Sequence, residues 1–161
     1  MIRTISLPST DYVARLLGGL LDREVTAAKD DDAGPSPQQA GLVALYAQDD
    51  GAVAALCVCD LDLAARAGAA LTLVPADNAL EAVKQGYLPD SIEENAHEIL
   101  NVAARLFNSP RSPHVALRGV HRLPGMLPAD ARGLLSAPAG RLGVQVEIEG
   151  YGSGHLWLLT S

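Results

Sequence analysis

The sequence has few aromatic residues, and this scarcity limits what can build its core. Aromatic side chains make up only 4% of the 161 residues, so the aliphatic side chains of Ala, Leu and Val must supply most of the buried volume. Apolar residues as a whole reach 48% and the mean hydropathy is +0.15, which excludes a chain that is disordered throughout. This length is typical of one domain, so we expect a single domain over residues 1–161.

Positive charge is also scarce. Lys and Arg number 12 against 19 Asp and Glu, for a net charge of −7, and only Lys29 and Lys84 are lysines. The chain has no cluster of basic residues of the kind that binds nucleic acid or an anionic membrane surface. No apolar run reaches the roughly 20 residues of a spanning helix, and residues 1–4 do not begin an apolar signal segment. We therefore expect a cytoplasmic protein that binds neither nucleic acid nor membrane.

The two cysteines, Cys57 and Cys59, are too few for a disulfide framework or a zinc site. They lie two positions apart in an expected strand, where both side chains point to one face and a mutual disulfide is awkward. A zinc site needs about four ligands, and no second Cys/His pair is spaced to complete one. We expect buried, reduced thiols.

Capping and turn residues divide the chain into elements. Ser9 or Thr10 can begin a helix, Pro75 and Gly86 can bound another, and the Asp-Asp-Gly run at 49–51 between two apolar runs predicts a hairpin. The expected helices are 10–22, 61–73, 75–85, 90–108 and 129–135, and the expected strands are 23–28, 40–47, 52–59, 114–121, 143–149 and 156–159.

The order helix, strand, loop, hairpin occurs twice, with the helical stretch 61–86 between the two copies. This order predicts an α+β fold with a pseudo-two-fold repeat, in which helices pack on an antiparallel sheet. The loop of the first copy, residues 29–39, is acidic and proline-rich, so we expect a mobile surface loop there.

The helix expected at 90–108 carries the most information, because it is amphipathic. At about 100° per residue its apolar stripe contains Ile92, Ala96, Ile99, Ala103 and Leu106. The opposite face contains Glu94, Glu98, Asn101 and Arg105, and Asp90 or Ser91 can cap the helix. One interpretation of this face is a solvated surface on which Glu98 or Asn101 reaches Arg105.

A second interpretation comes from a family. The CheC, CheX and FliY chemotaxis phosphatases carry Asp or Ser, three residues, Glu, two residues, Asn, twenty-two residues and Pro. The chain resembles this pattern: Glu98 and Asn101 supply Glu-x-x-Asn, and Pro124 stands at the proline position. Two positions depart from it, because Glu94 replaces the Asp or Ser and Arg105 stands where the family often has Gly.

The first copy of the repeat does not preserve the motif. At the matching spacing it has Asp11, Arg15 and Gly18. The chain is therefore similar to the CheX-like members with one motif, rather than to the CheC-like members with two.

The resemblance implies an activity, a partner and roles for these residues. The substrate would be the aspartyl phosphate of a CheY-like response regulator, which brings its own Mg²⁺, so the chain would need no cofactor. Asn101 would orient the attacking water, and Glu98 would pair with a lysine of the regulator. Glu94 and Arg105 would belong to the docking surface and Pro124 would shape a loop. Because CheX-like proteins are dimers, the resemblance also implies a homodimer.

A binding module of the same fold is the alternative. Its catalytic face would have drifted, and it would dock a signalling or flagellar-switch partner or serve only for dimerisation. Other features do not indicate a functional site. His97 and His121 are not spaced with carboxylates for a metal site, the glycine-rich run 150–154 is typical of a turn between strands, and Trp157 is expected in the core.

Overall fold

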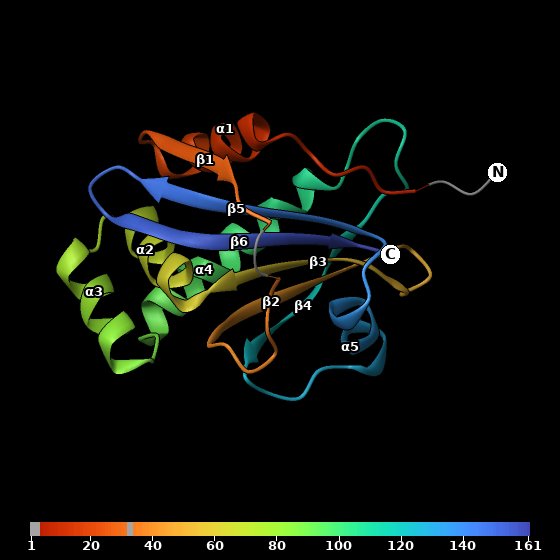
Figure 1. Cartoon of the computed structure of the whole chain (residues 1–161). Helices are drawn as coiled ribbons and strands as arrows, with labels where there is room; N and C mark the ends of the chain where they lie inside the picture. Colours follow the sequence, from red (N-terminus) through yellow and green to blue (C-terminus); the bar gives the residue numbers. More distant parts are fainter. Residues whose placement is uncertain (1–3, 32–33) are drawn as a thin grey trace.

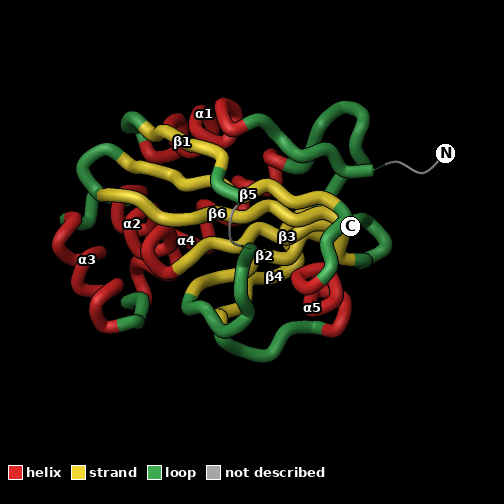
Figure 2. Tube along the Cα trace, viewed as in Figure 1, coloured by secondary structure: helices red, strands yellow, loops and turns green. Residues whose placement is uncertain are grey.

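The computed structural model describes residues 4–31 and 34–161, which form one antiparallel sheet with helices on both faces (Figures 1 and 2). The first part of the chain contains α1 (Thr10–Leu21), β1 (Val25–Lys29), β2 (Gly41–Ala47), β3 (Val53–Asp60), α2 (Leu61–Leu71) and α3 (Ala76–Gln85). The second part contains α4 (Asp90–Val102), the 3-10 helix η1 (Ala103–Leu106), β4 (Ala116–Leu123), α5 (Ala129–Ser136), β5 (Gly140–Ile148) and β6 (Gly152–Thr160).

The sheet contains the internal repeat that the element order predicts. Its strand order is β1-β5-β6-β3-β2-β4, and every neighbouring pair is antiparallel. Exchanging β1 with β4, β2 with β5 and β3 with β6 turns this order into its own reverse. An approximate two-fold axis therefore lies between β3 and β6, whose pairing extends from Ala55 with Thr160 to Cys59 with Leu156. The predicted α+β fold with a pseudo-two-fold repeat is confirmed.

The sheet separates a large core from a small one. Behind the sheet in Figure 1, α1, α2, α4 and η1 cover one face, and their apolar side chains pack on Tyr46, Cys57 and Leu158. On the other face α5 places Ala131, Leu134 and Leu135 against strand residues that include Val58 and Trp157. Alternate residues of each central strand feed the two cores, as the period of a strand requires.

Most of the expected elements are confirmed within a few residues. Ser9 caps α1 by accepting a 3.1 Å hydrogen bond from the Tyr12 N–H, and Gly86 ends α3 with a φ of 70° that suits glycine. Both cysteines are free and buried, and burial raises the pKa of the Cys59 thiol to about 12. Trp157 is a core residue, at 4% exposure.

Two boundaries around the key helix differ from the prediction. Pro89, not Asp90 or Ser91, is the N-cap of α4, and no side chain bonds there. The α-helix ends at Val102 and continues only as η1 to Leu106, short of Asn108. Asn108 instead donates to the Val115 carbonyl at 2.8 Å and accepts from its N–H at 2.9 Å, which ties the chain into the turn before β4.

Strand β4 begins two residues later than predicted. Its bounds follow from its pairing with β2, where Gly41 faces Leu123 and Ala47 faces Ala116. The bounds of a strand depend on its register with the partner strand, and a local sequence pattern holds no information about that partner.

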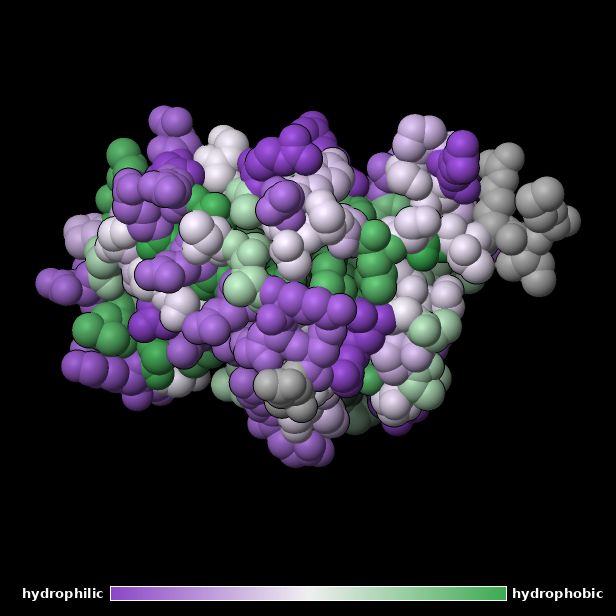
Figure 3. Space-filling model, turned by 45° about the horizontal axis from the view of Figure 1, so that its top comes forward, coloured by the Kyte–Doolittle hydropathy of each residue, from purple (hydrophilic) through white to green (hydrophobic). Residues whose placement is uncertain are grey.

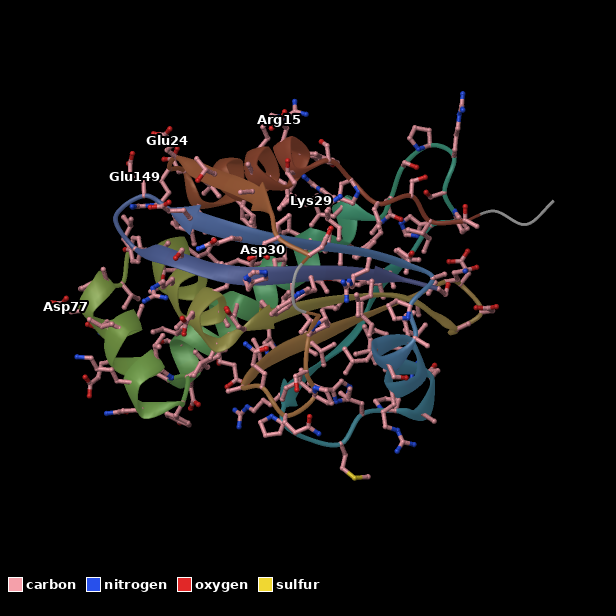
Figure 4. The ribbon with its side chains drawn as sticks, viewed as in Figure 1. Arg15, Glu24, Lys29, Asp30, Asp77 and Glu149 are labelled. Atoms are coloured by element: carbon pink, nitrogen blue, oxygen red, sulfur yellow. The ribbon has the colours of Figure 1, made fainter. Side chains whose placement is uncertain are left out.

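The acidic stretch after β1 is bonded to the sheet at its start. Asp31 accepts a 2.6 Å hydrogen bond from the Gly143 N–H, which lowers the pKa of its carboxyl, and Lys29 lies 3.4 Å from the same carboxylate. Figure 4 shows Asp30 in front of β5 and β6, and His155 of β6 lies 3.6 Å from its carboxylate. Residues 32 and 33 of the predicted loop lie outside the described residues.

Among the described helices none is both long and apolar enough to cross a membrane. The face drawn in Figure 3 mixes hydrophilic and hydrophobic side chains, with hydrophilic ones most frequent.

Candidate functional site

Three motif side chains lie on the exposed face of α4. Glu94, Glu98 and Asn101 are exposed, whereas Ile92 and Ile99 on the opposite side are 1% and 7% exposed. At about 100° per residue, positions 94, 98 and 101 fall within about 60° of one another around the helix. In the part of the chain that the structure describes, these three side chains make no hydrogen bond or ion pair. They are therefore available to a partner.

Arg105 lies beside this face because the helix changes its winding. It belongs to η1, where each residue advances about 120° instead of 100°. Two such steps carry Arg105 roughly 40° further from Asn101 than a continuous α-helix would. The Arg105 side chain is exposed and, within the described residues, forms no ion pair with Glu98. A guanidinium in this place leaves the Glu98–Asn101 surface open.

Pro124 follows β4 directly, and its side chain is exposed. The Leu123–Pro124 peptide bond is cis, and Leu123 is buried against the core under α5. Two residues earlier, Arg122 donates to both carboxylate oxygens of Glu93, at 2.8 and 2.6 Å. The turn that carries Pro124 is thus joined to the helix that carries Glu98 and Asn101.

A hollow of about 180 Å³ opens beside this ion pair. It is lined by Asp90, Glu93, Glu94, His97 and Arg122. The His97 Nε2 lies 3.7 Å from a Glu93 oxygen, and the same carboxylate raises the pKa of Arg122. The hollow borders the motif at Glu94 and is wide enough for a side chain of a docked partner.

On its other flank α4 is fixed to α2. Asn95 donates to the Gly68 carbonyl at 2.9 Å and to the Thr72 hydroxyl at 2.8 Å. The two helices approach so closely at Gly68 that a Cβ there would lie 2.5 Å from the Ile92 carbonyl oxygen. Glu93, Arg122 and Asn95 were not among the residues that the sequence singled out. Their partners are 23 to 29 residues away along the chain, so no local pattern predicts these contacts. The opposite charges of Glu93 and Arg122 were the only signal in the sequence that could have suggested one of them.

No family model and no curated protein matches the chain. Solved structures do match. The FliM middle domain of Vibrio alginolyticus superposes with a TM-score of 0.61 at 8% identity, over 94% of this chain and 87% of that one. Thermotoga maritima FliY gives a TM-score of 0.50 at 13% identity, over 94% and 89%.

The fold is that of the FliM middle domain and FliY. A Borrelia burgdorferi CheX, solved with CheY, beryllofluoride and magnesium, superposes less closely, with a TM-score of 0.43 at 9% identity over 92% of each chain. Because FliY is one of the proteins that carry the Glu-x-x-Asn motif, its likeness shows that the fold expected from the motif is the fold observed. The likeness extends to FliM, which the sequence had not suggested.

Within this FliY-like fold, α1 is the two-fold counterpart of α4, and its exposed face is chemically different. Arg15 stands where α4 has Glu98, and Figure 4 shows it pointing outward from α1. Gly18 stands where α4 has Asn101 and offers no amide. Of these two related helices, α4 therefore presents an adjacent carboxylate and carboxamide and α1 does not.

The remaining candidates have structural explanations. Of the glycine-rich run, only Gly150 and Tyr151 lie in the turn between β5 and β6, where Gly150 has a φ of 81° that suits glycine. Residues 152–154 belong to β6 and pair with residues 146–148 of β5, so the predicted turn was too long and β6 begins four residues before the predicted start at 156. In the described part of the chain no three His, Cys, Asp or Glu side chains are grouped closely enough to hold a metal ion. The His97 Nε2 lies 3.7 Å from the Glu93 carboxylate, and His121 lies in β4, paired with Val43.

Proposed function

We propose that this protein hydrolyses the aspartyl phosphate of a response regulator, using the exposed face of α4. The observation that carries the proposal is the pair Glu98 and Asn101, both exposed, one helical turn apart and without partners among the described residues. An acyl phosphate is already activated, so its hydrolysis needs a positioned water and stabilised charge more than a strong base.

Asn101 would position the water. Its amide oxygen can accept a hydrogen bond from water while its NH₂ donates to a phosphoryl oxygen. Water then attacks phosphorus in line with the aspartyl oxygen. The bond from phosphorus to that oxygen breaks, and inorganic phosphate and a free carboxylate result. The Mg²⁺ that neutralises the phosphoryl oxygens would come with the regulator, as part of the substrate.

Glu98 would fix the register of docking. It lies about one turn before Asn101, so a partner lysine that pairs with it would bring the phosphoryl group beside the amide. The charge of Glu93 is paired with Arg122, but Asp90 and Glu94 leave this end of α4 acidic and therefore attractive to a basic partner surface. Glu94 and Arg105 would flank the docked regulator, and Pro124 would shape the neighbouring turn.

The test is the decay of phosphorylated response regulators from the same cell, with Mg²⁺ present. We expect the wild-type protein to accelerate decay of at least one regulator above its own spontaneous rate. Asn78→Ala is the matched control, because Asn78 is an exposed amide on the remote helix α3. Acceleration by Asn78→Ala but not by Asn101→Ala would support the proposal, and no acceleration of any regulator by wild type would refute it.

A binding module is the second candidate, and one observation favours it. The likeness to the FliM middle domain, at a TM-score of 0.61, is higher than that to FliY, at 0.50. The departures Glu94 and Arg105 point the same way. This module would bind a signalling or flagellar-switch partner without hydrolysis. Regulator binding that leaves the aspartyl phosphate intact would establish it.

We also propose a cytoplasmic homodimer. The edge strands β1 and β4 each have one unpaired side in the described sheet, which a second copy could extend. Light scattering at high micromolar concentration should give twice the chain mass, whereas a monomer at that concentration would contradict the dimer.

A further inference from the structure

Two polar ties hold α4, and they lie on opposite sides of the motif. Around the helix, Glu93 and Asn95 are each about 100° from Glu94, one in each direction. Glu93 ties α4 to β4 through Arg122, and Asn95 ties it to α2 through Gly68 and Thr72. The exposed motif face is thus bracketed, and together the ties resist rotation of α4 about its own axis.

The tie to β4 is the more specific one. The Arg122 guanidinium binds the Glu93 carboxylate in bidentate geometry, which defines orientation as well as distance. The Glu93 side chain is only 12% exposed, unlike the exposed Glu94 beside it. β4 is an edge strand that pairs with β2 alone in the described sheet, so the Glu93–Arg122 ion pair adds to the few contacts that hold it in place. Pro124 follows Arg122 by two residues, so the same ion pair fixes the proline turn relative to α4.

A small rotation would be enough to misplace Asn101. A helix with its side chains is about 10–12 Å across, so a turn of roughly 10° moves a side-chain tip by about 1 Å. A misplacement of that size can slow a positioned reaction by about 100-fold. The predicted loss falls on the reaction step, because Asn101 acts on water mainly in the transition state.

We infer that Glu93 and Arg122 are positioning residues, which hold α4 at one rotation relative to the Pro124 turn so that Asn101 meets the reacting water. This inference rests on the proposed phosphatase function. Neither side chain needs to touch the phosphoryl group, and each acts through the orientation of α4.

The test measures kcat and KM for one phosphorylated regulator with Glu93→Ala, Arg122→Ala and the charge swap Glu93→Arg with Arg122→Glu. The matched control is Arg118→Ala, which removes another β4 ion pair, the 2.9 Å contact with Asp130 of α5. We expect the two single variants to lose about 10- to 100-fold in kcat with a smaller change in KM. The swap should recover part of the loss, and Arg118→Ala should keep wild-type kcat.

Folding is monitored by thermal unfolding, where both single variants should melt within a few degrees of Arg118→Ala. Retention of wild-type kcat by Glu93→Ala and Arg122→Ala would overturn the inference while leaving the phosphatase function intact. A loss confined to KM, or an equal loss of kcat in Arg118→Ala, would also overturn it. If wild type is no faster than Asn101→Ala, the proposed function itself fails and this inference fails with it.

Discussion

Gly68→Ala would test the close packing of α2 against α4. A Cβ at this position would lie 2.5 Å from the Ile92 carbonyl oxygen and 2.9 Å from the Ile92 Cγ2. The nearest atom belongs to the backbone of α4, so a side-chain rotation cannot relieve the contact and the helix must shift. Overpacking of this kind typically costs about 1–3 kcal/mol.

The control is Gly19→Ala in α1, where an added Cβ meets nothing within 4 Å. Because Ala favours a helix over Gly by about 1 kcal/mol, Gly19→Ala should raise the melting temperature by about 2–4 °C. Gly68→Ala gains the same helix preference and also suffers the contact with Ile92. Its free energy of unfolding should therefore fall about 1–3 kcal/mol below that of Gly19→Ala, which corresponds to roughly 2–12 °C in melting temperature.

The assay is reversible thermal or urea unfolding of both variants and wild type. If Gly68→Ala is as stable as Gly19→Ala, α4 does not pack on α2 as described, and the positioning of the motif face loses its structural basis.

Three further predictions concern the motif face and the acidic segment. Glu98→Ala should weaken regulator binding, measured by titration. Raising the salt concentration should weaken the binding of wild type more than the binding of the variant. Equal salt dependence of the two would exclude Glu98 from the interface. Arg105→Gly should leave phosphatase activity unchanged or raise it, although a helical Gly should lower the free energy of unfolding by about 1 kcal/mol. A loss of activity in a folded variant would contradict this and show that Arg105 contributes to docking. Asp31→Asn should reduce the free energy of unfolding above about pH 4, because the hydrogen bond from Gly143 lowers the folded-state pKa of Asp31. That contribution is present above the unfolded-state pKa and is lost as pH falls through the folded-state pKa. The free energies of unfolding of wild type and Asp31→Asn, measured against pH, should therefore converge in acid. A constant difference between them at all pH values would contradict the bond.

The elements were predictable where a local signal defines them. The amphipathic stripe of Ile92, Ile99 and Leu106 predicted which face of α4 is buried, and Ser9 and Gly86 marked helix ends through their capping chemistry. The exposure of Glu98 and Asn101 followed from the same stripe, because residues opposite a buried face must meet solvent.

The remaining features depend on contacts between distant segments. Nothing near Asn108 in sequence shows that its side chain will bond Val115 and that the α-helix will give way to η1, which moves Arg105 aside. The pairing of each single strand with the hairpin of the other half is likewise set by the assembled sheet. The Glu93–Arg122 pair spans 29 residues and becomes visible only once β4 lies beside α4.

The central claim is that the Asn101 amide acts on the reacting water, and single-turnover decay of a phosphorylated regulator tests it most directly. The measurement uses saturating protein with Mg²⁺, so that differences in binding do not enter the rate. Asn101→Ala should stay folded, because the exposed side chain has no partner among the described residues and Ala favours a helix over Asn by up to about 0.7 kcal/mol. We expect the variant to bind the regulator with nearly wild-type affinity and to leave its decay at the spontaneous rate. Decay as fast as with the wild-type protein would contradict the account.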